Sequence, residues 1–195
     1  MTRAPAILTA SQRQVSGKLV TPTLEHVIRS RPARIVVAVL RLSVGFVFLW
    51  TFFDKAFGLG YPTVTSRSWI RGGSPTQELL TGSTVVGPLK PLFAAVAGPA
   101  ADILFMTGML VVGLAVMFGV ALRISAIIGS VMLLLMFLAA WSFDRNTGST
   151  NPLVDSHIIS ALVLIAFASL SAGDTWGFGL DWRRLPLVKR MPWLV

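Results

Sequence analysis

The chain has 195 residues, of which 54% are hydrophobic and 13% are charged, and its mean hydropathy is +0.74. These values exclude an ordinary soluble domain and predict a single membrane domain. The absence of cysteine excludes disulfides, thiolate metal sites, Cys-ligated iron–sulfur clusters and covalent haem attachment. Basic residues that flank membrane helices explain the net charge of +9 better than nucleic-acid binding does, because no basic stretch is interleaved with stacking aromatic residues.

The N-terminal half is predicted to hold one membrane span between a tail and a long loop. Residues 1–34 are polar and basic and are predicted to form a flexible cytoplasmic tail. The apolar run 35–53 is long enough to cross a bilayer and too long for the core of a cleaved signal peptide. An outer segment follows from about residue 56 to residue 99. In it, Ser74, Pro75 and Gln77 form a helix-start signature, and Gly82 is the expected stop.

Three further apolar runs are predicted to span the membrane, at residues 100–121, 124–143 and 153–172. A short turn at Leu122 and Arg123 joins the first two, and Asn151 and Pro152 open the last. Residues 173–195 are predicted to form a cytoplasmic C-terminal tail. The predicted fold is therefore all-α: an integral membrane antiparallel four-helix bundle, with a long outer loop between its first and second helices. The distribution of Lys and Arg predicts that both termini lie in the cytoplasm of a multi-pass cell-membrane protein.

Polar residues collect where these spans begin or end on the outer side. They are Asp54 and Lys55, Asp102, Asp144 and Arg145, and Asn151, Asp155 and His157. In an antiparallel bundle these places lie at the same end. Ionisable groups in a membrane domain are costly, so this set is expected either to anchor the bundle or to perform chemistry.

Each of these candidates has a structural and a chemical interpretation. Lys55 and Asp102 are expected either to form an ion pair that fixes helix docking or to belong to a proton or substrate site. His157 is either a hydrogen-bonded interior residue or a proton-transfer group, since histidine exchanges protons readily near neutral pH. Asp155 and Asp102 are its candidate companions. No spacing of ligands predicts a metal site.

Arg41 lies six residues into the first span. Its side chain is expected either to extend back to lipid phosphates or to face the interior of the bundle. The two histidines, His26 and His157, are predicted on opposite sides of the membrane, which argues against a bis-histidine haem within one chain. No glycine-rich nucleotide or flavin loop is present, because Gly58, Gly60, Gly72 and Gly73 lack the required spacing and a preceding strand.

Several short motifs recur in a fixed order along residues 34–181. They are Leu40-Arg41-Leu42 with Gly45, Phe48, Asp54 and Lys55; Trp69 to Thr76; Asp102; Arg123; Asn151-Pro152 with His157; and Gly177 to Asp181. In this order they resemble the DoxX/DoxD family of small bacterial four-helix membrane proteins. The outer-loop motif is similar to the branch of that family that has the longer loop.

The resemblance implies a membrane subunit of a thiosulfate:quinone oxidoreductase, with a bound quinone and a second small subunit or a periplasmic or secreted redox partner. In that role His157, Asp155 and Asp102 are the catalytic candidates for proton delivery. The candidates for holding substrate or quinone are Arg41, Lys55, Asp54, Arg71 and Asn151. Two alternatives stay open. One is a non-enzymatic scaffold that docks a redox or stress-response partner through the outer loop, and the other is a small transporter or lipid-binding protein.

Overall fold

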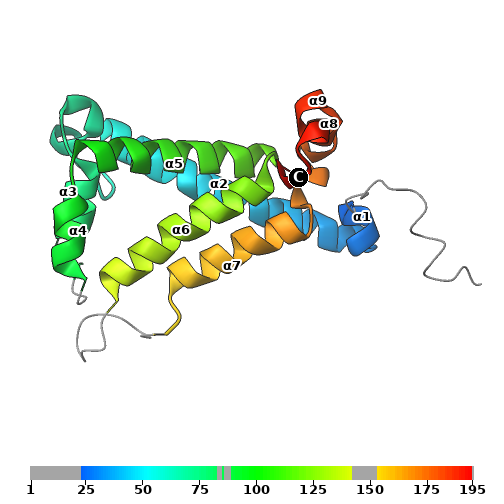
Figure 1. Cartoon of the computed structure of the whole chain (residues 1–195), viewed down its shortest axis with the longest axis horizontal. Coiled ribbons are helices and arrows are strands. Elements are labelled where there is room, and N and C mark those ends of the chain that lie inside the picture. Colours follow the sequence, from blue (N-terminus) through cyan, green and yellow to red (C-terminus); the bar gives the residue numbers. More distant parts are fainter. Residues whose placement is uncertain (1–22, 83–84, 86–88, 142–152, 195) are drawn as a thin grey trace, which may run out of the picture.

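The computed structural model describes residues 23–82, 85, 89–141 and 153–194, and in these ranges it is helical without strands (Figure 1). Four apolar helices form its body: α2 (Arg31–Phe57), α5 (Pro99–Phe118), α6 (Leu122–Ala140) and α7 (Ser156–Ser169). Five short helices accompany them: α1 (Leu24–Val27), α3 (Pro75–Thr81), α4 (Lys90–Val96), α8 (Gly179–Arg184) and α9 (Pro186–Arg190). Single 3₁₀ turns are η2 (Thr65–Arg67), η3 (Trp69–Arg71), η4 (Ala172–Asp174) and η5 (Pro192–Leu194).

The helix lengths support the predicted all-α membrane class. By length and composition α2, α5 and α6 can cross a bilayer. Helix α7 is apolar but has only 14 residues, or about 21 Å of rise against a hydrocarbon layer of about 30 Å. The helix bounds differ from the apolar runs because capping groups set where helices begin and end. For example, α2 continues through Asp54 and Lys55 to a left-handed cap at Gly58, and α7 begins only after Asp155.

Small residues allow consecutive apolar helices to pack closely in opposite directions. Helix α2 meets α5 where Gly45 lies against the backbone of Met117 and Leu49 lies against Gly113. Helix α5 meets α6 through Gly108 and Met132, and α6 meets α7 through Gly129 and Leu164. Because lipid is as apolar as these side chains, no hydrophobic effect drives membrane helices together. The close approaches stabilise the helix pairs through van der Waals contacts instead. Contact between α2 and α7 is far less extensive than contact between α2 and α5.

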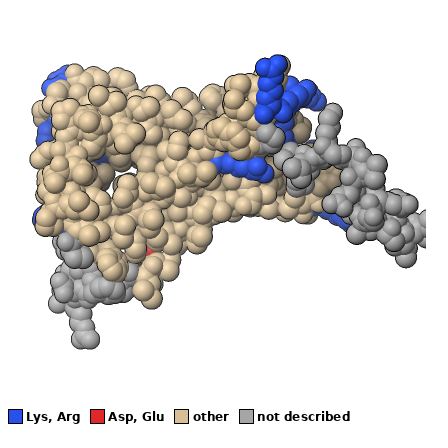
Figure 2. All heavy atoms as spheres, in the orientation of Figure 1, with Lys and Arg blue, Asp and Glu red and all other residues tan. Residues whose placement is uncertain are grey.

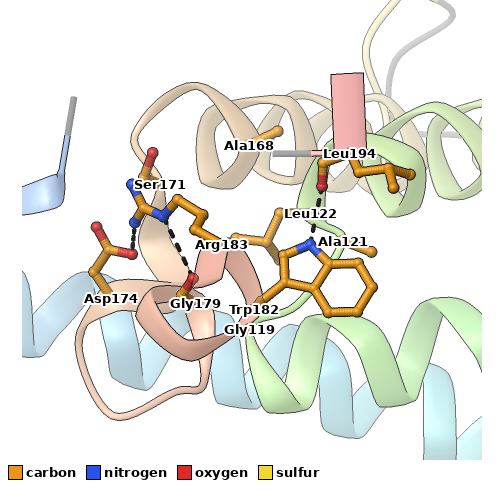
Figure 3. A pocket seen from close by; sticks show the side chains of 11 residues that line it. Gly119, Ala121, Leu122, Ala168, Ser171, Asp174, Gly179, Trp182, Arg183 and Leu194 are labelled. Atoms are coloured by element: carbon orange, nitrogen blue, oxygen red, sulfur yellow. Dashed lines mark hydrogen bonds and ion pairs between the residues drawn. The ribbon is translucent and has the colours of Figure 1, made fainter. Parts of the chain in front are cut away.

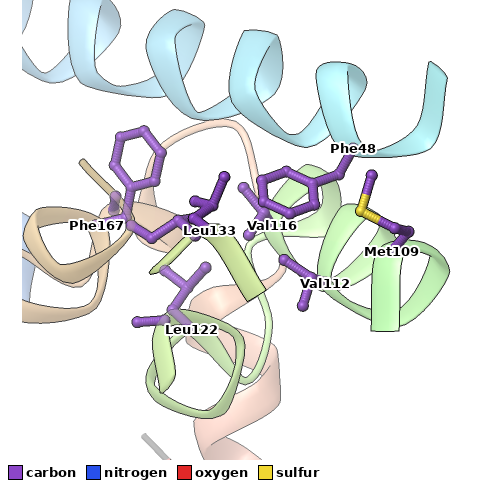
Figure 4. Packing of buried hydrophobic residues seen from close by; sticks show 10 residues of the cluster. Phe48, Met109, Val112, Val116, Leu122, Leu133 and Phe167 are labelled. Carbon is purple, nitrogen blue, oxygen red and sulfur yellow. The ribbon is translucent and has the colours of Figure 1, made fainter. Parts of the chain in front are cut away.

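These contacts define two ends of the molecule, which we name for the segments they carry. The tail end carries α8, α9 and the turn that joins α5 to α6, and the loop end carries α3, α4 and the start of α7 (Figure 1). The main apolar core fills the space between the helices (Figure 4); its labelled members include Phe48, Val112, Leu133 and Phe167. A second cluster at the loop end joins Val85 and Phe93 to Ala139 of α6. Figure 1 shows α3 and α4 running across the direction of α5, as a cap over this end.

The predicted helix start in the outer loop is confirmed. Ser74 precedes α3 as its N-cap, Pro75 occupies the first turn, and the Ser74 hydroxyl accepts a hydrogen bond of 3.2 Å from the amide of Gln77. Gly82 follows as the C-cap residue. The chain does reverse before α6, but the turn lies earlier than the predicted Leu122 and Arg123, which already belong to α6. Gly119 and Ala121 form it, in the left-handed region at φ 72° and 47°.

Replacing Gly45 by alanine is expected to destabilise the α2–α5 contact by about 1–3 kcal/mol, a typical cost of overpacking. A Cβ at this position would lie 2.7 Å from the backbone nitrogen of Met117, which cannot move independently of its helix. Gly108→Ala is the control, because the new methyl would meet only the flexible end of Met132. Thermal unfolding in detergent measures both variants. Equal midpoints for the two would contradict this account of the packing.

Candidate functional site

Arg41 is fully buried at the tail end and ties three segments together. Its Nη1 donates to the carbonyls of Val116 at 2.6 Å and Met117 at 2.5 Å, in the last turn of α5. Its Nη2 donates to the carbonyls of Trp176 at 2.8 Å and Thr175 at 3.4 Å, which follow η4. The carbonyls at the end of a helix lack partners within it and carry partial negative charge, so a guanidinium satisfies both needs. The side chain of Arg41 therefore faces the interior and binds backbone carbonyls rather than lipid phosphates.

The C-terminal segment folds against the tail end through polar contacts (Figure 3). Arg183 forms an ion pair with Asp174, whose other carboxylate oxygen accepts from the amide of Leu24 at 2.9 Å. Trp182 Nε1 donates to the carbonyl of Leu194 at 3.1 Å. Burial lowers the pKa of the Arg183 guanidinium from its ordinary value. The space among these residues measures about 30 Å³, room for roughly one water molecule, so this cluster is a structural joint.

At the loop end, two buried carboxylates anchor the outer segment to the helices. Asp54 accepts from the amides of Thr63 at 3.0 Å and Tyr61 at 3.3 Å, which fixes the chain as it leaves α2. Asp102 accepts from the amide of Thr76 at 2.7 Å and from the Thr76 hydroxyl at 2.6 Å, which docks α3 on α5. Both carboxylates are thus engaged in positioning the loop. This arrangement corrects the expectation that Lys55 is the partner of Asp102.

The remaining polar candidates of the loop end are distributed unevenly. Lys55 is half-buried and lies one helical turn beyond Thr51, on the same face of α2. No ion pair of Lys55 occurs within the described part of the chain. Arg71 is exposed on η3, a turn that contacts α2. Asn151, Asp144 and Arg145 lie outside the described residues.

Asp155 and His157 form a compact pair at the start of α7. Asp155 Oδ1 accepts from the amides of His157 at 2.9 Å and Ile158 at 3.1 Å, as a helix N-cap. Its Oδ2 lies 2.6 Å from His157 Nδ1. A carboxylate against Nδ1 fixes the ring orientation and directs the exchangeable position to Nε2, as in other histidines held by a second polar group.

His157 of this pair lines a cavity of about 320 Å³, to which all four apolar helices contribute. The lining residues are Val44, Val47, Phe48 and Thr51 of α2, Met109 of α5, Met132, Leu133 and Met136 of α6, and Ser156, His157 and Ser160 of α7. The volume falls within the range of small-molecule sites, about 300–1,000 Å³, which are mostly apolar with a few polar groups. Methionine supplies a polarizable and adaptable wall for a flat or irregular ligand.

Along the bundle, His157 lies further from the loop end than the last residue of the neighbouring helix α6 does. Ser130 Oγ donates to the carbonyl of Ala161 at 3.3 Å, which sets the register of the antiparallel pair α6 and α7. Four residues back from Ala161, His157 is therefore level with Leu134. Leu134 lies six residues before the last residue of α6, Ala140, or about 9 Å along the axis. The short α7 thus brings a titratable pair to the depth of an apolar layer.

Comparison with known proteins adds no family: no family model, no curated protein and no solved structure matches the chain. Arguments about function therefore rest on the site itself. Of the predicted site residues, the structure places His157 on the cavity with Asp155 held against its ring, and it places Asp54, Asp102 and Arg41 elsewhere as anchors. Sequence reasoning missed Thr76 as the partner of Asp102, although its place in the first turn of α3 is the kind of signal that could have shown it.

Replacing Arg41 by leucine is expected to loosen the tail end. The carbonyls of Met117 and Trp176 would lose their donor, at about 1–3 kcal/mol for each group left unsatisfied. Hydrogen exchange should rise in residues 172–190 and at the end of α5. Arg34→Leu is the control, since Arg34 pairs with the exposed carboxylate of Glu25. Unchanged exchange in the Arg41 variant would contradict the anchoring role.

Proposed function

We propose that this chain is a quinone-linked oxidoreductase subunit of the DoxD type, and that the cavity beside His157 holds the quinone ring. The proposal includes its membrane form, an antiparallel four-helix bundle with both termini in the cytoplasm. The observation that carries it is the cavity of about 320 Å³ with a histidine–aspartate pair at its loop end. The resemblance of the sequence motifs to the DoxX/DoxD family supports the choice of quinone among lipophilic ligands.

The surroundings of the cavity suit a ligand that arrives through the bilayer. Val47 lines the cavity and is 61% exposed, which indicates an opening on the side of α2. Contact between α2 and α7 is sparse, so we place the entrance between these two helices. A quinone dissolved in the membrane would enter by this side with its isoprenoid tail left in lipid. The apolar wall of Phe48 and Met136 would hold the ring. The hydroxyls of Thr51 and Ser160 donate to carbonyls of their own helices, which leaves His157 as the donor to the oxygens of the ring.

His157 and Asp155 supply the proton chemistry that quinone reduction requires. Reduction of one quinone to the quinol takes two electrons and two protons. Asp155 at Nδ1 fixes the orientation of the ring, so that Nε2 of a protonated His157 would donate to a quinone carbonyl oxygen and pass its proton to that oxygen as it gains charge. The second proton and the reprotonation of His157 come from water at the loop end. Two thiosulfate ions that join into tetrathionate release the two electrons, directly or through a partner subunit.

Lys55 is the best-placed candidate for the anionic substrate. It continues the face of α2 that lines the cavity, one turn nearer the loop end, and an ammonium group there attracts an oxyanion. Arg71 remains a second candidate on the exposed surface. Asp54 and Asp102 support this end by holding the loop, which leaves His157 and Asp155 as the groups for proton delivery.

The central test is quinone binding by His157→Ala, with His26→Ala as the control. The chain has two histidines, and His26 lies at the tail end in α1. In lipid nanodiscs, the wild type should bind decylubiquinone, and His157→Ala should weaken binding by about 10–100-fold, the value of a hydrogen bond to a charged group. His26→Ala should bind as the wild type does. Ser160→Phe, which fills the cavity, should abolish binding. Wild-type affinity in both cavity variants would contradict the proposal.

A scaffold that docks a partner protein is the second candidate, favoured by the shape of the loop end. Asp54 and Asp102 hold the outer segment in place, while Ile70 on η3 is 63% exposed beside Arg71. An apolar side chain on a rigid surface is a typical docking element. Ile70→Asp should reduce co-purification of a partner at least tenfold, whereas Leu92→Asp, at an exposed position on α4, serves as the control. Equal recovery from the Ile70 variant and the wild type would exclude docking at η3.

A further inference from the structure

A second and larger groove lies between α6 and α7 on the side of the tail end. Its volume is about 570 Å³. Ala126 and Ala168 give it a shallow floor of small side chains, and Ile127, Val131 and Ile165 form its apolar walls. These three wall residues are 67%, 53% and 48% exposed. In a membrane protein such a groove faces lipid, and it is separate from the cavity beside His157, with which it shares no lining residue.

The groove has a polar end and an apolar end. Arg123 lies in the first turn of α6, and Ile127 and Val131 follow it at intervals of four residues on the same face of the helix. Ser169 and Ser171 border the same polar end from α7 and the residues after it. Arg123 therefore lies at one end of an apolar trough that runs along α6 and α7.

The surface around this polar end is positive. Lys189 and Arg190 are exposed on α9, whereas Arg183 and Arg184 of α8 are paired with carboxylates. Figure 2 shows a group of Lys and Arg side chains gathered at α8 and α9. This charge favours an anionic occupant. A second copy of this chain would bring a second positive tail end against the first, at an electrostatic cost.

We propose that the groove between α6 and α7 binds an anionic phospholipid of the bilayer, with its phosphate at Arg123 and one acyl chain along Ile127, Val131 and Ile165. Basic pockets between membrane helices recognise anionic lipid head groups in this way. The guanidinium provides a planar set of donors for phosphate oxygens. The small side chains of Ala126 and Ala168 leave room for an extended hydrocarbon chain against the helices. This inference is independent of quinone binding at the other end of the molecule.

The test is native mass spectrometry of the purified full chain in detergent, titrated with phosphatidylglycerol or phosphatidylcholine. The wild type should bind phosphatidylglycerol about fivefold more tightly than phosphatidylcholine, the preference expected from one basic residue near a membrane surface. Arg123→Gln should remove this preference, and Arg123→Lys should keep most of it. Ser169→Trp, at the exposed rim of the groove, should weaken binding of both lipids.

Arg190→Gln is the matched control, because it removes the same charge from the same end and lies outside the groove. Its preference for phosphatidylglycerol should equal that of the wild type. An equal loss in Arg190→Gln and Arg123→Gln would overturn the proposal in favour of general surface charge. Full competition by glycerol 3-phosphate, which has no acyl chains, would overturn the role of the groove. Unchanged thermal unfolding of Arg123→Gln would show that its loss of preference does not come from misfolding.

Discussion

The fold depends on the guanidinium of Arg41, which is fully buried and donates hydrogen bonds to four backbone carbonyls. A charge in an apolar layer is stable only where polar groups replace its water shell. The end of α5 and the segment after η4 provide those groups, so one side chain joins α2, α5 and the C-terminal segment. The glycines around it permit this approach. A Cβ on Gly177 would lie 2.6 Å from the carbonyl of Gly173, and one on Gly119 would lie 3.0 Å from Arg41 Nη1.

With the tail end joined by Arg41 and the loop end docked by Asp102 and Thr76, α2 and α5 form one unit along their length. Helices α6 and α7 form a second unit through Gly129 and Ser130. Figure 1 shows α6 leaving α5 towards the loop end, and the cavity beside His157 occupies the space between the two units. The site therefore follows from two pairs of tightly packed helices that converge at one end. Its polar pair is brought inward by the shortness of α7.

The sequence predicts the features that depend on local pattern. Four apolar runs became four apolar helices, and Ser74 and Gly82 begin and end α3 as their residue types indicate. The grouping of Asp54, Asp102 and Asp155 at one end followed from the alternating direction of the runs. Partners distant in the sequence were beyond prediction: Thr76 binds Asp102 across 26 positions, and Arg41 binds carbonyls that no side-chain pattern marks. The length of α7 was also hidden, because the apolar residues Leu153 and Val154 precede its cap at Asp155.

The central claim is that His157, held by Asp155, meets a quinone in the cavity between the two helix pairs. Nitrogen-15 NMR of the imidazole rings tests it most directly, because the chain has only two histidines and selective labelling gives one pair of ring signals for each. Addition of decylubiquinone to the labelled protein in nanodiscs should shift the Nε2 signal of His157 and leave both signals of His26 in place. An unchanged His157 ring at a quinone concentration that saturates the protein would contradict the account.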